Sequence, residues 1–194
     1  MQDTELYQRI LGLKAPWSVT GVKLDVRAKV VEVWVGHVDG ARWPCPACGA
    51  SLATYDHVEE RTWRHLDTCD LMTLLRARTP RVECPQHGVK RVQVPWAEPL
   101  SRFTLLFECR AIGVLKEADV KGTTRILQMG WKEAWRIQEK AVARGLAAKE
   151  AAVIRHLGVD EKAIAKGHQY FTLVCDVDRG TVEYVAEDRK QESL

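Results

Sequence analysis

Apolar residues alternate with polar ones along residues 17–97, which is the period of a half-buried β-strand. Two runs of apolar residues show the alternation most clearly: Val22, Leu24, Val26, Val31, Val33 and Val35. Segments 71–75 and 89–94 are further strand candidates, and turn signals such as Asp39-Gly40 separate the strands. The pattern therefore predicts a small β-rich domain.

Segments with the hydrophobic period of a helix flank this domain. Within residues 1–16, Leu6, Ile10 and Leu13 have the spacing of one helix face, so a short N-terminal helix is expected. Residues 101–150 lack proline and are rich in Leu, Ala, Glu, Lys and Arg. They predict three helices, at about 102–116 with Ser101 as N-cap, about 120–128, and 131–148. Two helices joined by a turn that contains Gly130 have the outline of a helix-turn-helix.

A second strand pattern follows the helices. The candidates are 153–159, 169–175 and 181–186, and Asp178-Arg179-Gly180 offers a tight turn between the last two. The expected fold class is therefore α+β. We expect four parts: a helix in 1–16, a β-rich domain in 17–97, a helical segment in 98–150 and strands in 151–194.

Composition and charge narrow the function classes. The chain of 194 residues is 46% hydrophobic, enough for a packed core, and carries a net charge of +3. That mild excess does not by itself establish a nucleic-acid partner. No signal peptide and no apolar run long enough to span a membrane are visible, so a cytoplasmic location without a membrane partner is expected. In that reducing compartment the six cysteines are better explained by metal binding than by disulfides.

Two short motifs share the spacing of metal-binding knuckles. The first is Cys45-Pro46-Ala47-Cys48-Gly49 and the second is Cys84-Pro85-Gln86-His87-Gly88. Each places two ligands three positions apart before a glycine, which supplies the backbone angles that a tight turn needs. Cys45, Cys48, Cys84 and His87 together match a tetrahedral structural zinc site. The alternative is unpaired buried cysteines beside a coincidental histidine.

The remaining cysteines and His65 lack knuckle spacing. Cys69 has no partner nearby in the sequence and is expected to be a simple thiol. Cys109 and Cys175 lie on apolar faces and are expected in the core. His65 is expected to be a surface or packing residue.

The helical segment is the most basic part of the chain. Residues 101–150 contain ten Lys or Arg against six Asp or Glu. Four basic residues recur at every fourth position, which predicts a stripe along one helix: Lys132, Arg136, Lys140 and Arg144. Another, more apolar face is expected to pack on the preceding helices, with Trp131 and Trp135 as its anchors, and it contains Ala134, Ile137, Ala141 and Gly145. The stripe suits a recognition helix that contacts DNA, and an ordinary solvated helix face explains it equally well.

One carboxylate has a candidate catalytic position. Asp160 follows the apolar run 153–159 in Gly158-Val159-Asp160-Glu161-Lys162. A carboxylate on a buried strand is costly unless it meets a partner or a metal, so Asp160 is a candidate ligand of a two-metal phosphoryl-transfer site. A solvent-exposed aspartate at a strand end is the alternative, and the pattern alone favours it.

Taken together, these motifs resemble the ISL-type family of insertion-sequence transposases. The stretches that carry the resemblance are the two knuckles, Arg61-Thr62-Trp63-Arg64-His65-Leu66, Ser101-Arg102-Phe103-Thr104, Gly158–Lys162, Lys166-Gly167-His168-Gln169-Tyr170 and Glu187-Asp188-Arg189-Lys190. The resemblance implies a zinc ribbon over 17–97, a helix-turn-helix module over 98–150 and the first strands of a truncated ribonuclease-H-like β-meander over 151–194.

The resemblance also implies residue roles. Asp160 would be the first carboxylate of an Asp-Asp-Glu triad whose other members lie beyond residue 194, and Mg²⁺ would serve only the full-length enzyme. Lys162, Lys166 and His168 would lie near the active-site mouth or the DNA.

We therefore expect the DNA-binding front portion of a transposase that recognises transposon ends and does not cleave DNA alone. Its expected partner is double-stranded DNA, and a second copy of the chain is a further candidate. Two alternatives stay open at this point. The catalytic part could come from a separate or frameshifted polypeptide, or the chain could be a stand-alone zinc-containing transcription regulator.

Overall fold

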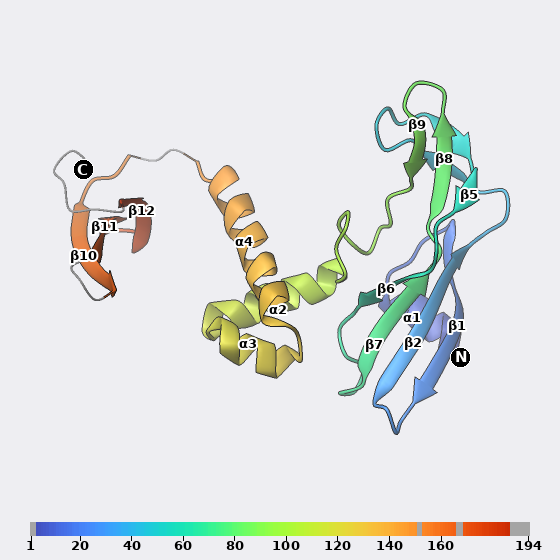
Figure 1. Ribbon diagram of the computed structural model, residues 1–194, viewed down its shortest axis with the longest axis horizontal. Helices are drawn as coiled ribbons and strands as arrows, with labels where there is room; N and C mark the ends of the chain where they lie inside the picture. The colour runs from blue at the N-terminus through green and yellow to red at the C-terminus, as the bar shows by residue number, and fades with distance from the viewer. Residues whose placement is uncertain (1–2, 151–152, 166–168, 187–194) are drawn as a thin grey trace. The chain divides into compact units, whose positions relative to one another are not determined.

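The computed structural model describes residues 3–150, 153–165 and 169–186. The chain divides into two compact units, residues 1–144 and residues 145–194, and each is treated by itself below. Helices and mainly antiparallel sheets occupy separate segments of the chain (Figure 1), so the expected α+β class is confirmed. No helix in the described part is long and apolar enough to cross a bilayer.

A four-stranded sheet forms the base of the first unit. Its order is β1-β2-β7-β6, with β1 at Trp17–Asp25, β2 at Val30–His37, β7 at Met72–Ala77 and β6 at Arg61–Arg64. Strands β2 and β7 run parallel, and the other neighbours pair antiparallel. The alternation in β2 has its expected consequence, because Val31, Val33 and Val35 are all buried.

The N-terminal helix α1, Asp3–Ile10, packs against β1 with a different face from the one expected. Tyr7 is buried, whereas Leu6 and Ile10 are exposed. Leu13 is buried, but it lies beyond the helix end, so the three-residue face predicted from spacing is wrong. A short helix needs only one large side chain to anchor it, and Tyr7 lies close to Val31 and Val33.

Two smaller sheets complete the β-rich part. Strands β3, Arg42–Pro44, and β4, Ser51–Ala53, form one, and the other has the order β5-β8-β9, at Asp56–His57, Pro80–Cys84 and Gly88–Arg91. One core joins these sheets to the large one. It is built around four buried tryptophans in mutual contact: Trp17, Trp43, Trp63 and Trp96.

Three helices follow: α2 at Leu105–Glu117, α3 at Val120–Leu127 and α4 at Trp131–Ala147. The second and third agree with expectation to within a residue. The N-cap of α2 is Thr104, not Ser101, since the Phe107 N–H donates to the Thr104 hydroxyl at 3.3 Å. Ser101 instead donates to the buried carboxylate of Glu108 at 2.7 Å. Backbone bonds to the sheet keep residues 101–104 extended, because Thr104 N–H donates to the Arg64 carbonyl.

Side-chain burial on the helices differs from expectation at three positions. Cys109 was expected in the core and is exposed on α2. Trp131 and Trp135 are half exposed and contact each other, with ring centroids 5.3 Å apart, so they do not anchor the packed face of α4. Ala134 and Ile137 fill that role and are buried.

The second unit contains an antiparallel sheet of order β10-β11-β12, at Leu157–Ala165, Gln169–Asp176 and Thr181–Ala186. Strand β10 begins four residues later than predicted, so Asp160 lies inside the strand and not at its end. The apolar run 153–159 could not fix the boundary, because a short run has no clear period. Cys175, expected in the core, is half-buried. The β11–β12 turn forms as predicted, and Gly180 has a φ of +64°.

Candidate metal centre and nucleic-acid interface

The first knuckle is the turn between β3 and β4. Cys45 follows the last residue of β3, its N–H donates to the Ala50 carbonyl at 2.8 Å, and its carbonyl accepts from the Gly49 N–H at 2.8 Å. Gly49 has a φ of +74°, a conformation that L side chains rarely adopt. The turn folds back within five residues and directs Cys45 and Cys48 to the same side.

The second knuckle is the hairpin turn between β8 and β9. Cys84 ends β8 and pairs with Gly88, whose φ is +66°. The His87 N–H donates to the Cys84 carbonyl at 3.3 Å, which closes the turn. The two knuckles are built alike, so the matching sequence motifs correspond to matching backbone turns.

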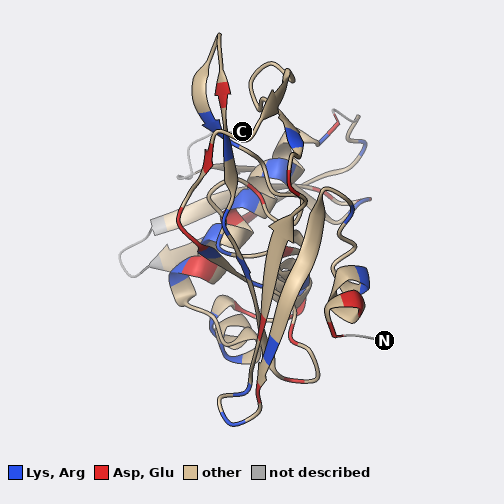
Figure 2. Cartoon of the chain, turned by 90° about the vertical axis from the view of Figure 1, so that its right-hand side faces the viewer, with Lys and Arg blue, Asp and Glu red and all other residues tan. Residues whose placement is uncertain are grey.

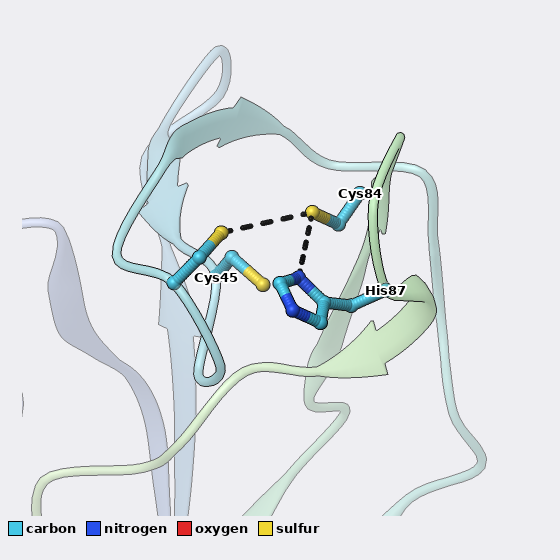
Figure 3. A group of neighbouring side chains, drawn as sticks. Cys45, Cys84 and His87 are labelled. Carbon is cyan, nitrogen blue, oxygen red and sulfur yellow. Dashed lines mark hydrogen bonds between the residues drawn. The ribbon is translucent and has the colours of Figure 1, made fainter.

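The two turns bring four ligand atoms together. The three sulfurs and a nitrogen of His87 all lie within 4.8 Å of one another, and Figure 3 shows Cys45, Cys84 and His87 converging. The Cys48 and Cys84 sulfurs are 3.8 Å apart, and the Cys84 sulfur is 3.4 Å from His87 Nδ1. Zinc–sulfur bonds of about 2.3 Å at tetrahedral angles separate two sulfurs by about 3.8 Å. The spacing and the donor set both fit zinc.

Local hydrogen bonds tune the thiols of this cluster. The backbone N–H of Ala47 lowers the pKa of Cys45, which favours the thiolate that binds metal. The Ala50 N–H also acts to lower the pKa of Cys48, but desolvation and the neighbouring thiols outweigh it and raise that pKa. Among the described residues, no other group of three or more His, Cys, Asp or Glu side chains is placed to hold an ion.

The remaining thiol and imidazole groups lie apart from this centre. Cys69 is exposed in a turn. His65 is buried, and its Nδ1 lies 2.9 Å from the Thr104 hydroxyl. The expectation that His65 has a packing role, and not a ligand role, agrees with this position.

The basic residues of α4 do not form a single stripe. Each fourth residue advances about 40° around a helix of 3.6 residues per turn, so four such residues wind across about 120°. Lys132 and Arg136 are exposed and make no ion pair with any described residue. Lys140 and Arg144 lie nearer the packed side, and both pair with Glu98, at 3.7 Å and 3.2 Å. The structure thus divides the predicted set into two free and two paired cations.

Charge over the rest of the chain is mixed. Figure 2 shows basic and acidic residues interspersed along strands and helices. A face for a polyanion therefore depends on the placement of a few particular residues. The α3–turn–α4 arrangement is the strongest candidate, since Asp119 caps α3, Gln128 ends it with a φ of 49°, and α4 starts three residues later.

The candidate catalytic residue is placed in the second unit. Asp160 is exposed on β10, opposite Leu173 of β11, and its Oδ1 accepts from the Glu161 N–H at 2.8 Å. Lys162 is exposed on the same strand. Lys166 and His168 lie outside the described residues.

Sequence reasoning missed two features of this region. One is Glu98, which holds Lys140 and Arg144. The other is Arg64, whose side chain is largely buried against the first turn of α2, with its guanidinium 5.5 Å from the centre of the Phe107 ring. In the sequence, residues 61–66 carry the family resemblance but predict no role for Arg64. The available signal was the pair of arginines that flank Thr62-Trp63 on strand β6.

Two known protein families match segments of the first unit. Residues 41–87 match the family described as the zinc-finger of transposase IS204/IS1001/IS1096/IS1165. Residues 92–142 match the helix-turn-helix domain of transposase family ISL3. The first range contains the whole four-ligand cluster, and the second contains α2, α3 and most of α4.

Individual relatives extend the likeness. The chain is 28% identical over 158 residues to the transposase for insertion sequence element IS1557 of Mycobacterium tuberculosis. It is 24% identical over 150 residues to the transposase for insertion sequence element IS1001 of Bordetella parapertussis. Each alignment covers 77% of this chain but 34% and 37% of those relatives, so the chain spans about a third of their length. No solved structure matches the chain significantly.

Proposed function

Because the chain carries the N-terminal zinc-ribbon and helix-turn-helix domains of the ISL3 family of transposases, we propose that it recognises the DNA ends of an insertion sequence. In this proposal α4 enters the major groove, and the zinc ribbon supports the helix-turn-helix module structurally. The observation that carries it is the pair of unpartnered cations Lys132 and Arg136 at the start of the helix that follows the turn. The N-terminal part of a recognition helix is the part that contacts base edges and flanking phosphates.

The zinc ion has a structural role in this proposal. Cys45, Cys48, Cys84 and His87 supply four ligands, which completes a tetrahedral shell and leaves no open position for a substrate. The ion would fix the two knuckles and, through Trp43 and Val82, the core that carries the large sheet.

We propose that Asp160 corresponds to one metal-binding carboxylate of the catalytic domain that longer proteins of this family contain. Magnesium in phosphoryl transfer requires several converging oxygen ligands. Among the described residues, Asp160 belongs to no group of three or more His, Cys, Asp or Glu side chains placed to hold an ion. Cleavage would therefore need carboxylates that the described part of this chain does not bring to Asp160.

The test is a binding assay against duplexes that carry the terminal repeats of the parent element, with unrelated duplexes for comparison. Replacing Lys132 and Arg136 by Ala should weaken binding and reduce the slope of log K against log salt by about two, one per lost phosphate contact. Replacing Lys140 and Arg144 should cost less, since Glu98 already neutralises part of their charge.

The matched control replaces Lys23 and Arg27, two exposed cations of the β1–β2 hairpin. Equal binding of terminal and unrelated duplexes would exclude end recognition. Unchanged affinity in the Lys132/Arg136 variant would exclude this face of α4 as the DNA contact.

A further inference from the structure

A cleft of ≈ 480 Å³ separates the large sheet from the turn that joins α3 to α4. Arg61 and Arg64 of β6 line one side, Arg102 lines it from the segment before α2, and Gln128 and Met129 line it from the turn. Three arginines from two separate segments of the chain thus share one concave surface. All of these residues belong to the first compact unit.

Arg64 has donor groups without acceptors. Its side chain is 10% exposed, and its Nη2 pairs with Asp67 at 2.6 Å. Its Nε and Nη1 are buried and have no hydrogen-bond partner among the described residues. The face of Phe107 lies against the guanidinium but offers no lone pair. Buried charged donors left unpaired are costly and rare, so Arg64 is a lining residue of the cleft with hydrogen-bonding capacity to spare.

The backbone holds the second arginine beside the first. Arg64 N–H donates to the Arg102 carbonyl at 2.8 Å, and the Arg64 carbonyl accepts from Thr104 N–H at 3.0 Å. The Arg102 side chain is exposed and makes no hydrogen bond or ion pair with a described residue. Arg61 is held by a bond from its Nη2 to the Ser101 carbonyl at 3.2 Å.

The cleft is cationic overall. Burial lowers the pKa of Arg61, and the nearby charges of Arg91 and Arg102 lower it further, so positive charge here is not fully compensated. Glu133 is the one carboxylate among the described lining residues. Its Oε2 accepts from the Gly130 N–H at 2.9 Å and is thereby engaged at the start of α4.

We propose that this cleft binds one phosphate group, held by Arg64 and Arg102, with Arg61 contributing charge. Guanidinium groups present paired donors that match phosphate oxygens, and such bonds are strong where water is partly excluded. The cleft borders the turn that precedes α4, so a phosphate bound there would belong to the DNA strand flanking the groove that α4 enters. This assignment rests on the proposed function. The bound phosphate would add a contact through which the zinc ribbon and the helices both bind the same duplex.

The first arm of the test measures DNA binding by the 194-residue chain with Arg102→Ala, an exposed position whose loss should not disturb folding. Affinity for terminal and unrelated duplexes should fall by about ten-fold alike, and the salt slope should lessen by about one. The Arg64→Lys variant, which keeps the charge but removes the forked donors, should lose DNA affinity to a similar extent. Arg27→Ala on the β1–β2 hairpin is the control and should bind as the parent does.

If the parent chain binds DNA and both cleft variants bind equally well with the same salt slope, the cleft proposal is overturned and the proposed function stands. If the parent binds no duplex, the proposed function fails and the second arm decides the cleft. That arm titrates inorganic phosphate and follows the arginine Nε–H resonances by NMR. Shifts of the Arg64 and Arg102 resonances at millimolar phosphate, with no Arg64 shift in the Arg102→Ala variant, would show that the cleft binds free phosphate. No shift, in a chain that binds no DNA, overturns the proposal.

Discussion

His65 lies at the join between the large sheet and the first helix of the helical module. Its N–H donates to the Thr73 carbonyl at 2.8 Å, and its ring contacts the Thr104 hydroxyl that caps α2. Burial lowers the pKa of His65 to about 4, so the imidazole is neutral at ordinary pH. A single buried and neutral residue therefore connects the end of β6 to the N-terminus of α2.

This burial predicts a pH dependence of stability. An unfolded histidine has a pKa of about 6.5, so between pH 6.5 and 4 the unfolded chain binds more protons than the folded one. The free energy of unfolding should therefore fall as the pH drops through this window, by at most about 3 kcal/mol. Denaturant titrations of the parent chain and of His65→Gln at several pH values measure the effect.

The quantity to follow is the difference in unfolding free energy between the parent chain and the His65→Gln variant, because acid also releases zinc from both proteins. The gap in unfolding free energy should narrow as the pH falls from 6.5 to 4. A gap that stays constant over this range would show that His65 does not titrate with folding.

At the scale of elements, the zinc knuckles join the two small sheets, which also share the core built around the tryptophans. Strands β3 and β4 pair over three residues, and β8 and β9 over four, which is too little to be stable alone. Metal binding of this type contributes on the order of 10 kcal/mol, comparable to the stability of a whole domain. The small sheets should therefore depend on zinc more than the four-stranded sheet does.

Cys84→Ser should accordingly yield protein without stoichiometric zinc. Amide hydrogens of β3, β4, β8 and β9 should exchange rapidly, whereas those of β2 and β7, at the centre of the large sheet, should remain the more protected. Elemental analysis and hydrogen exchange with mass spectrometry measure both effects. Cys109→Ser, at an exposed thiol on α2, is the matched control. One zinc per chain in Cys84→Ser would contradict the assignment of the ligands.

At the scale of the whole molecule, the second unit carries much exposed apolar surface. The exposed side chains lie on β10 and β12, the two outer strands of its sheet: Leu157, Val159, Ile164, Val182, Tyr184 and Val185. Strand β10 also has one pairing neighbour within the described residues, which leaves backbone groups free for another strand. Such a surface favours association between copies of the chain.

We therefore expect the 194-residue chain to self-associate in a concentration-dependent way. The double variant Val159→Lys and Val182→Lys places charge on both outer strands and should shift the equilibrium toward monomer. Sedimentation velocity over a range of concentrations gives the measurement. A parent chain that stays monomeric throughout would show that this surface is not a contact between copies.

The position of Asp160 leads to a prediction about chemistry. Since Asp160 belongs to no group of three or more potential metal ligands among the described residues, the 194-residue chain should neither nick nor join DNA in the presence of magnesium or manganese. The assay uses supercoiled DNA that carries the terminal repeats. Metal-dependent nicking by highly purified chain, lost in Asp160→Ala, would prove this expectation wrong.

The sequence by itself determined the local features. The period of two gave β2, the proline-free segment gave α3 and α4 to within a residue, and the paired knuckles gave the four ligands that converge. These features succeed because each depends on residues close together in the chain. Strand alternation, helix period and a ligand spacing of three positions are all set by local backbone geometry.

Only the tertiary structure decided which local candidates were used. Thr104 caps α2 in place of Ser101 because a backbone bond to Arg64 fixes where the extended segment ends. Lys140 and Arg144 both pair with Glu98, more than 40 residues earlier in the chain, which neutralises part of their charge. The cleft at Arg64 and Arg102 arises from a similar long-range pairing. Contacts between segments distant in sequence depend on how sheets and helices pack, and no periodicity along the chain encodes that packing.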